Sequence, residues 1–290
     1  MKYKVTHRTR YTCQDQVSVG HNQAWLEFRS TDHQQVESFA LMITPEPSVR
    51  TRRLDAFRNP VQMFSFNEGY QLLDVTATTL VTVRPREISA AGRLRTLQEG
   101  LAMLRNPEER QRNEALEFRF ASPRIQWTPE IRAYAERSLA VDRPLLQSVL
   151  ELTHRLHHDF AYDNRATTVN TPITDVFRLK RGVCQDFAHL QIAMLRAVGI
   201  PCRYVSGYLR TIPPPGQPRL VGADASHAWL SVYLGGGEWV DVDPTNNQIC
   251  ARDHITLAWG RDYGDVPPLT GVFMGGGQHQ LSVSVDVQPL

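Results

Sequence analysis

The chain has 290 residues, of which 41% are apolar and 21% are charged, the proportions of an ordinary globular protein rather than of a disordered or fibrous one. At roughly 100–200 residues per domain, this length predicts two domains. The 32 basic and 30 acidic residues leave a formal net charge of +2, and no block of like charge stands out, so we expect no nucleic-acid partner.

The sequence shows no sign of a targeting segment, a membrane span or a metal-binding cysteine pair. Residues 1–11 contain no apolar core of the kind that a secretory signal has. The longest apolar stretches, such as residues 192–195, are far shorter than the ~20 residues that a membrane-spanning helix needs. The cysteines include no CxxC pair and are too sparse for a disulfide framework. We therefore expect a cytoplasmic protein with no membrane partner and no metal or cofactor, while its oligomeric state stays open.

Residues 1–86 are predicted to form short strands. Apolar and β-branched residues are frequent over 36–44 and 72–83, and in the second segment they recur at every other position, as on one face of a strand. Arg58, Asn59 and Pro60 are typical of a turn. Short strands separated by turns predict a small antiparallel β-sandwich as the N-terminal domain.

Helical signals begin in the middle of the chain. Residues 87–125 are polar, and we expect a connector there with one short helix near 94–104. Thr128 followed by Pro129 predicts a helix start, because a hydroxyl N-cap and a proline in the first turn are both favoured. A second helix is expected to open near residues 142–144, with a buried apolar stripe after it.

The catalytic core is predicted over residues 126–270, with a closing strand segment over 271–290. Residues 160–176 are typical of a loop, and the apolar pattern that follows predicts a helix over 184–198 that ends at Gly199. Strands are expected over 203–209, 228–234, 238–243 and 281–287.

Cys184 lies at the predicted start of that helix, two residues after Gly182. The first backbone N–H groups of a helix lack partners within it, and this end carries about half a positive charge. Both effects favour the thiolate, and the same N–H groups can bind an oxyanion. The alternative is a buried structural cysteine, an interpretation that fits Cys13, Cys202 and Cys250 well.

Residues 226–243 predict a hairpin whose loop is the glycine run 235–237. In the expected register, His227 and Asp243 share one face as diagonal neighbours, about 7–8 Å apart between backbones, and Asp241 lies one step further away. The register pairs Leu234 with Glu238, Tyr233 with Trp239, Ser231 with Asp241 and Trp229 with Asp243. Asp243 is therefore expected to orient the imidazole of His227.

The three residue types together fit nucleophilic catalysis. A cysteine nucleophile needs a base that takes its proton and an acid that protonates the leaving amine, and imidazole does both near neutral pH. A carboxylate on the other ring nitrogen fixes the tautomer. Taken alone, His227 fits an ordinary strand histidine, and Asp243 fits a turn aspartate before a proline. Their occurrence with Cys184, in the order Cys, His, Asp, favours a cysteine enzyme that attacks amide bonds.

Residues 182–189, 226–229 and 243–246 closely resemble the bacterial transglutaminase-like superfamily, a group of papain-like cysteine enzymes. The strands before residue 83 and the tail also resemble this family's β-domain and closing segment. The resemblance implies an α+β fold in which a cysteine-bearing helix packs on an antiparallel sheet. It also implies that Cys184 is the nucleophile, His227 the base and Asp243 the orienting carboxylate.

The same resemblance extends to residues around the catalytic group. Tyr162 takes the position of an aromatic residue before the cysteine, which implies a side-chain oxyanion donor beside the Cys184 N–H. Gln185 and Trp229 are expected to contribute to the oxyanion or substrate-binding site, with Trp229 packed beside the imidazole.

Three interpretations of the function stay open. The first is an enzyme that forms an acyl-enzyme with a peptide or protein amide, which water resolves in a peptidase or amidase and an amine resolves in a transglutaminase. The second is a non-catalytic peptide- or protein-binding module, since fold does not determine function. The third is a metal site of Cys184, His189 and His227, although residues five apart share a helical face poorly.

Overall fold

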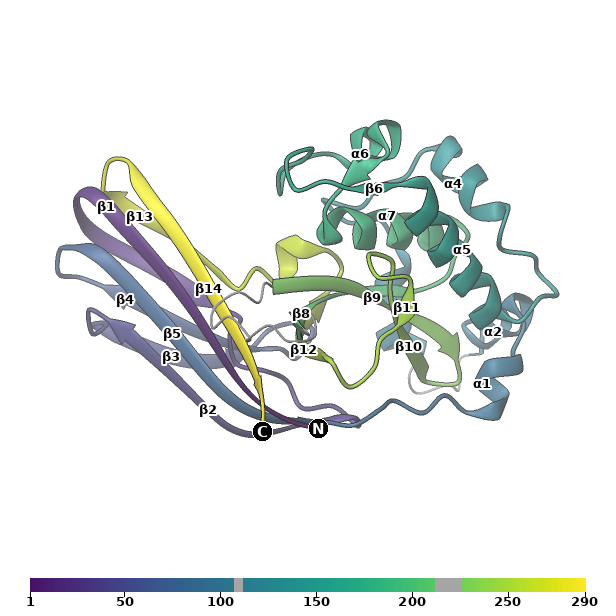
Figure 1. Cartoon of the computed structure of the whole chain (residues 1–290), viewed down its shortest axis with the longest axis horizontal. Helices are drawn as coiled ribbons and strands as arrows, with labels where there is room; N and C mark the ends of the chain where they lie inside the picture. Colours follow the sequence, from purple (N-terminus) through teal and green to yellow (C-terminus); the bar gives the residue numbers. More distant parts are fainter. Residues whose placement is uncertain (107–111, 212–225) are drawn as a thin grey trace, which may run out of the picture.

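The computed structural model describes residues 1–106, 112–211 and 226–290. It consists of a curled antiparallel β-sheet and a core of helices packed on a second sheet (Figure 1). The predicted α+β class is confirmed. In the part of the chain that the structure describes, no helix is both long and apolar enough to cross a bilayer.

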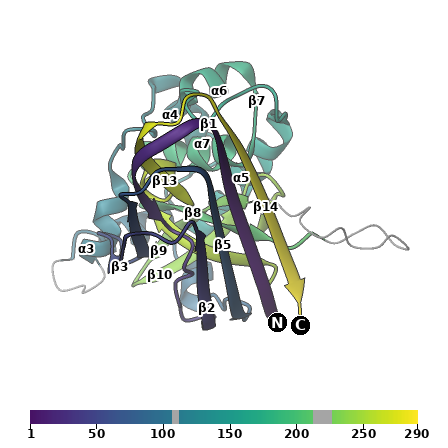
Figure 2. The same ribbon diagram turned by 90° about the vertical axis from the view of Figure 1, so that its left-hand side faces the viewer.

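The first sheet contains strands from both ends of the chain. Its order is β2-β5-β1-β4-β3, and β13 and β14 also pair with β1, which brings the two termini together (Figure 2). The tail that we expected as a closing strand is thus part of the N-terminal sheet. The strands are β1 (Lys2–Ala24), β2 (Gln34–Thr44), β3 (Val49–Leu54), β4 (Pro60–Phe66), β5 (Tyr70–Val83), β13 (Leu269–Gly275) and β14 (His279–Pro289).

The long strand β1 joins the two halves of this sheet. Its first half pairs with β5 and β14, and its second half, over residues 20–24, pairs with β4 and β13. Apolar side chains from both halves meet in one buried cluster that includes Phe64, Phe66 and Val75. The sheet therefore curls around this cluster, so that the two layers expected of a sandwich are continuous through β1.

The core is a five-stranded antiparallel sheet in the order β11-β10-β9-β8-β12, on which α7 packs. Its strands are β8 (Cys202–Leu209), β9 (Ser226–Gly235), β10 (Glu238–Asp243), β11 (Gln248–Ile249) and β12 (His254–Gly260). The helices are α1 (Ala90–Leu94), α2 (Leu97–Met103), α3 (Arg112–Leu116), α4 (Pro129–Glu136), α5 (Leu145–Asp159), α6 (Ile173–Leu179) and α7 (Cys184–Ala197). Two short strands, β6 (Ala161–Tyr162) and β7 (Arg181–Gly182), pair in parallel before α7.

Most predicted helices are present, with two differences. Thr128 caps α4, and α7 begins at Cys184, as expected. The connector over 87–125 holds α1, α2 and α3 instead of one helix, and Thr96 starts α2 by exchanging hydrogen bonds with Glu99. The segment expected as a loop over 160–176 contains β6 and the start of α6.

The hairpin of β9 and β10 has the predicted register beyond its first pair. Gly235, rather than Leu234, faces Glu238, so the loop is Gly236 and Gly237, whose φ angles of 62° and 79° suit a type I′ turn. A bulge next to this turn restores the expected pairs, which are Tyr233 with Trp239 and Ser231 with Asp241.

Side chains of the N-terminal region bind the edge strand β12 of the core sheet. The Gln34 amide donates to the Thr256 carbonyl at 2.7 Å and accepts the Thr256 N–H at 2.8 Å. Asn59 forms the same pair of bonds with Trp259, at 2.8 and 3.1 Å. These amides satisfy backbone groups that an edge strand leaves without a strand partner. They attach the curled sheet firmly to the core.

Candidate active site

Cys184 is half-buried at the first position of α7. The start of the helix is held by Asp186, whose carboxylate accepts the Val183 N–H at 2.9 Å and the Thr167 hydroxyl at 2.6 Å. A Cβ atom added to Gly182 would lie 2.6 Å from the Asp186 carboxylate, so glycine is required where the chain enters the helix. This local structure gives Cys184 the helix-start position that the sequence predicts.

His227, near the start of β9, lies in the same pocket as Cys184 and is hydrogen-bonded to Asp243. Its Nε2 lies 2.7 Å from Asp243 Oδ2, and its ring lines the pocket together with Cys184. Burial by itself lowers the pKa of His227, but the interactions with Asp243 and then with Cys184 outweigh it and raise the pKa to about 10. The ring therefore holds a proton next to the sulfur at neutral pH.

Asp243, the last residue of β10, is fully buried and accepts hydrogen bonds at both carboxylate oxygens. Oδ2 accepts from His227 at 2.7 Å, His254 at 3.0 Å and the Asn246 amide at 2.7 Å. Oδ1 accepts the N–H groups of Thr245 and Asn246. Burial favours the neutral acid, but the hydrogen bonds, first that of His227, outweigh it and hold the pKa of Asp243 well below its usual range. The carboxylate is thus ionised and immobile.

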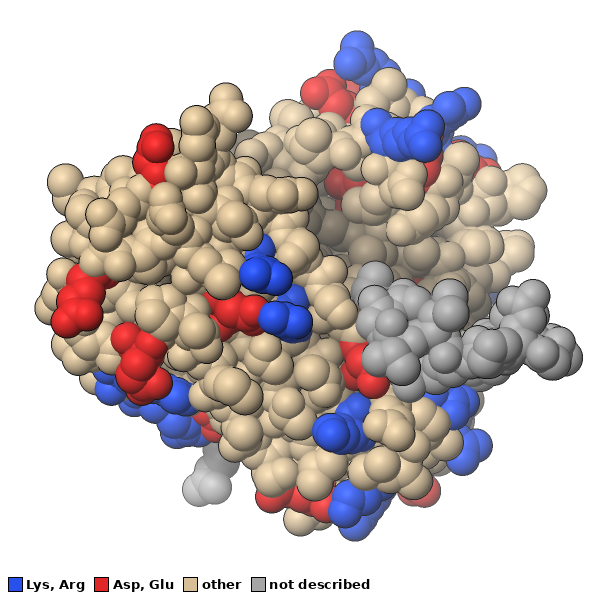
Figure 3. Space-filling model, turned by 60° about the vertical axis from the view of Figure 1, so that its left-hand side comes forward, with Lys and Arg blue, Asp and Glu red and all other residues tan. Residues whose placement is uncertain are grey.

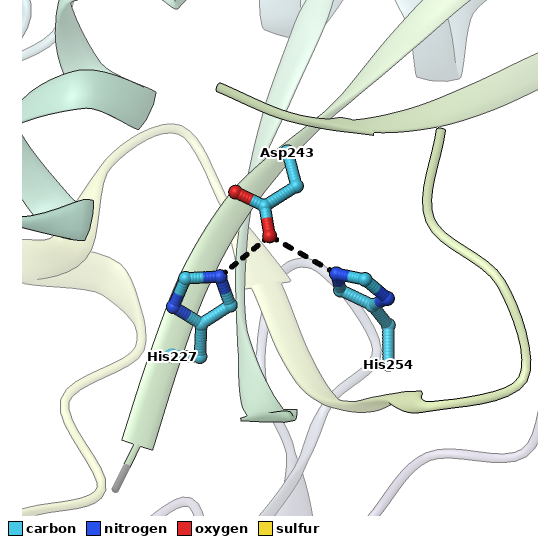
Figure 4. Close-up of side chains that lie close together, drawn as sticks. All are labelled: His227, Asp243 and His254. Carbon is cyan, nitrogen blue, oxygen red and sulfur yellow. Dashed lines mark hydrogen bonds and ion pairs between the residues drawn. The ribbon is translucent and has the colours of Figure 1, made fainter. Parts of the chain in front are cut away.

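His254 is a part of this site that the sequence did not reveal. It opens β12, and its ring and that of His227 point at the same oxygen of Asp243 (Figure 4). The Ala251 N–H donates to His254 Nδ1 at 3.4 Å, so Nε2 is the ring nitrogen that donates to Asp243. No motif surrounds His254 in the sequence.

The structure also separates the residues of the metal site that we considered. His189 accepts the Tyr263 N–H at its Nε2, at 3.1 Å, and its ring packs against Tyr204. Burial lowers the pKa of His189 to about 3, so the ring is neutral. Within the described ranges, the ligand-type groups that gather within 4.8 Å of one another are His227, Asp243 and His254. A site of Cys184, His189 and His227 is therefore wrong, because His189 is held by the segment after β12.

Tyr162 and Gln185 lie near the sulfur. Tyr162 pairs with Gly182 between β6 and β7 and is 59% exposed. Partial burial, and then the charge of Cys184, raise the pKa of the Tyr162 hydroxyl, so the hydroxyl stays protonated and able to donate. Gln185 donates to the Val169 carbonyl at 3.3 Å and lines the same pocket as Cys184. Both positions suit the roles that the resemblance implies.

Trp229 and Asp241 lie beneath the site. Trp229 packs beside His227 as expected, with ring centroids 6.1 Å apart, but it is fully buried and donates from Nε1 to Asp241 at 3.4 Å. The substrate contact expected of Trp229 does not fit this burial. Asp241 is ion-paired with Arg86 at 2.8 Å. Burial raises the pKa of Asp241, but the charge of Arg86 and smaller contributions such as the Ser231 hydrogen bond together outweigh this and the pKa is lowered, so Asp241 acts as a structural ion beside the site.

Cys184 and His227 open into a pocket of about 300 Å³ between the core and the curled sheet. Side chains of both parts line it, including Tyr263 from the core and Thr9 from β1. In the space-filling view, a recess separates the sheet from the helical part (Figure 3). A substrate that reaches the sulfur therefore contacts both parts of the molecule.

Comparison with known proteins agrees with this architecture. The model for the transglutaminase-like superfamily matches residues 132–244, and that for the bacterial transglutaminase-like N-terminal region matches residues 3–82. An uncharacterized Mycobacterium tuberculosis protein is 37% identical over 293 residues, which cover 99% of this chain and 93% of that protein. An uncharacterized Mycobacterium leprae protein is 30% identical over 296 residues, covering 100% and 99%.

Two further relatives have more specific names. A protein-glutamine gamma-glutamyltransferase of Pseudomonas aeruginosa is 30% identical over 145 residues, which cover 46% of this chain and 22% of that protein. The crystal structure of "a Putative Cysteine Protease from Cytophaga hutchinsonii" aligns with a TM-score of 0.75 at 21% identity, covering 100% of this chain and 91% of that one. The structural likeness shows that the two chains share a fold.

Proposed function

The chain belongs to the transglutaminase-like superfamily, and from this premise we propose that it is an enzyme that breaks amide bonds through an acyl-enzyme on Cys184. The observation that carries the proposal is the His227 ring, which shares a pocket with Cys184 and is hydrogen-bonded at 2.7 Å to the buried Asp243 carboxylate. A surface histidine has no need of a buried carboxylate partner, whereas a base that exchanges a proton with sulfur is oriented by one.

In the first half of the reaction, the proton of Cys184 resides on His227, and the thiolate attacks the carbonyl carbon of the amide. The oxyanion that forms is stabilised by the Cys184 backbone N–H and the Tyr162 hydroxyl. The His227 imidazolium then gives its proton to the leaving nitrogen, the C–N bond breaks, and an amine leaves. The acyl group remains on sulfur as a thioester.

In the second half, the neutral His227 ring takes a proton from water, and the resulting hydroxide attacks the thioester. The C–S bond breaks, a carboxylic acid leaves, and the proton returns to the Cys184–His227 pair. Asp243 keeps the ring in one orientation and stabilises its charged form through both halves. Hydrolysis is the outcome that needs nothing beyond water.

Acyl transfer to a primary amine is the second candidate. It uses the same thioester, with an amine in place of water, and the identity with the Pseudomonas aeruginosa protein-glutamine gamma-glutamyltransferase over 145 residues favours it. A non-catalytic binding module is the third, and it does not require that His227 share a pocket with Cys184.

The decisive experiment is turnover of a peptide library with and without an added primary amine, followed by mass spectrometry. Hydrolysis yields products that contain water in both conditions, whereas transfer yields products that contain the amine. Cys184→Ala should abolish turnover and the acyl-enzyme while the melting temperature stays the same. Cys250→Ala is a matched control, because Cys250 is also a half-buried free thiol. Turnover by Cys184→Ala, or acylation of Cys13 or Cys202, would contradict the proposal.

A further inference from the structure

We propose that the pocket selects an acyl donor in which the residue next to the reacting amide has an uncharged, apolar side chain, and that the inner face of the curled sheet binds this side chain. The inference rests on the proposed function, since it assigns a substrate class to the same pocket.

The pocket runs without interruption from the sulfur to the sheet. Leu281 and Val283 of β14 line it together with Cys184. Leu281 lies opposite Tyr11 of β1, and Val283 lies opposite Thr9. Directly opposed residues of antiparallel strands point to the same face, so these four side chains form one patch. Tyr11 and Thr9 also line the pocket, which confirms that the patch faces the sulfur.

Leu281 and Val283, the aliphatic part of this patch, are exposed, whereas the following part of the same face of β14 is covered. Val285 and Val287, the next two residues of β14 on this face, are 1% and 0% exposed. Leu281 and Val283 are 50% and 53% exposed. An apolar substrate group that covers them removes their surface and its own from water, which favours binding. The patch lies at the entrance to a site that must hold a substrate, so a substrate side chain is its natural occupant.

The described residues that line the pocket include no lysine, arginine, aspartate or glutamate. Of its two histidines, His227 carries a charge that is paired with the Asp243 carboxylate. His7 Nδ1 shares a hydrogen bond of 2.8 Å with the Tyr208 hydroxyl, and its Nε2 shares one of 2.9 Å with the Thr9 hydroxyl. Burial lowers the pKa of His7 to about 4, so it is neutral at pH 7. A charged side chain entering the pocket loses hydration and meets no unpaired counter-charge among the described residues that line it.

The hydrogen bond between Tyr208 and His7 also holds the patch on β1 and β14 in place. Tyr208 belongs to β8 of the core and His7 to β1 of the sheet, and both side chains are buried. The patch is therefore held at a constant distance from the sulfur, as a specificity pocket requires. In the space-filling view, the visible walls of the recess are mainly uncharged (Figure 3).

The test uses blocked peptides that share one reacting amide and differ only in the residue next to it, which is Leu, Phe, Glu or Lys. The wild-type protein should turn over the Leu and Phe peptides with kcat/KM about 10- to 100-fold above the Glu and Lys peptides. Val283→Lys should reverse this order for Glu against Leu, a gain that misfolding cannot produce. Ser282→Lys adds the same charge one residue away, on the opposite face, and should keep the wild-type order.

Three results would overturn the inference. They are equal turnover of Leu and Glu peptides by the wild-type protein, a wild-type preference for charged peptides, and the same change of order in Ser282→Lys as in Val283→Lys. Acylation by p-nitrophenyl acetate, whose acyl group is too small to reach β14, separates this from the proposed function. If the ester acylates Cys184 but the peptides are not distinguished, the substrate class is wrong and the mechanism stands. If neither the ester nor any peptide acylates Cys184, both fail.

Discussion

Replacing Asp243 with asparagine keeps the size of the side chain but removes the charge that holds a proton on His227. The pKa of His227 is about 10 against an ordinary 6.5, which corresponds to about 5 kcal/mol in favour of the imidazolium. Burial opposes this preference, and the hydrogen bond to Asp243 is the largest of the contributions that overcome it. In Asp243→Asn only Cys184 opposes burial, so we expect the pKa of His227 to fall to about 7 or lower.

The pKa of His227 can be followed by NMR of histidine-labelled protein. The imidazolium is populated below its pKa, so the wild-type ring should stay charged up to about pH 10, and the variant ring should lose its proton near neutrality. Cys184→Ser, which changes the smaller contribution, should lower the pKa less. In Asp243→Asn, kcat/KM should also fall by about 10²- to 10⁴-fold. A His227 ring that still titrates near pH 10 in Asp243→Asn would refute the assigned role of the carboxylate.

Three other predictions concern groups that support the site. His254→Ala removes a donor from the buried Asp243 and should lower the free energy of unfolding by about 1–3 kcal/mol in urea titrations. His254→Gln keeps a donor and should recover part of both the stability and the activity. Equal losses in the two variants would argue against a hydrogen-bonding role of His254. Gln34→Ala should lower the free energy of unfolding by about 1–3 kcal/mol in the same assay, because both hydrogen bonds of its amide to β12 are lost. Gln35→Ala, at the exposed neighbouring position, should leave it almost unchanged. Similar losses in the two variants would show that the Gln34 amide does not hold the edge strand. The stability that the neutral His7 ring contributes is complete above pH 6.5 and is lost as the pH falls toward 4, by up to about 3 kcal/mol, because the unfolded chain takes the proton first. The free energy of unfolding, measured by urea titration at pH 7 and 4.5, should therefore differ less between the two pH values for His7→Gln than for the wild-type protein. An equal difference would exclude His7 as the source of this pH dependence.

The approach of His227 to Asp243 could be predicted because it depends on local alternation. In a hairpin, residues on one face follow from the register, and the register follows from the loop. The loop is in fact one residue shorter than expected, but the bulge next to Gly235 offsets this difference. The pairing of Ser231 with Asp241 was therefore correct although the first pair was not.

His254 could not be predicted in this way. It reaches Asp243 because β12 pairs with β8, more than 40 residues earlier in the chain, and because the segment between β10 and β12 turns back toward Asp243. No periodicity in the sequence encodes that return. Trp229 shows the complementary failure, since alternation places it near His227 but does not reveal that the sheet is covered there.

The contribution of the tail to the pocket beside Cys184 was equally hidden. Alternation over residues 281–287 predicts a strand, and β14 spans them. Alternation does not identify the strand with which it pairs, and β1 lies at the other end of the chain. The wall of Leu281 and Val283 follows only from that long-range pairing.

The pairing of β1 with β14 determines when the first sheet can form. Tyr3 lies opposite Pro289, so β1, which is synthesised early, can pair with β14 only after the end of the chain has been synthesised. Such distant pairing is slow, and the apolar surface left bare meanwhile invites aggregation and chaperone binding. Leu281 and Val283 are synthesised after Cys184 and His227. A nascent chain thus carries the cysteine before it has the strand that completes the pocket around it.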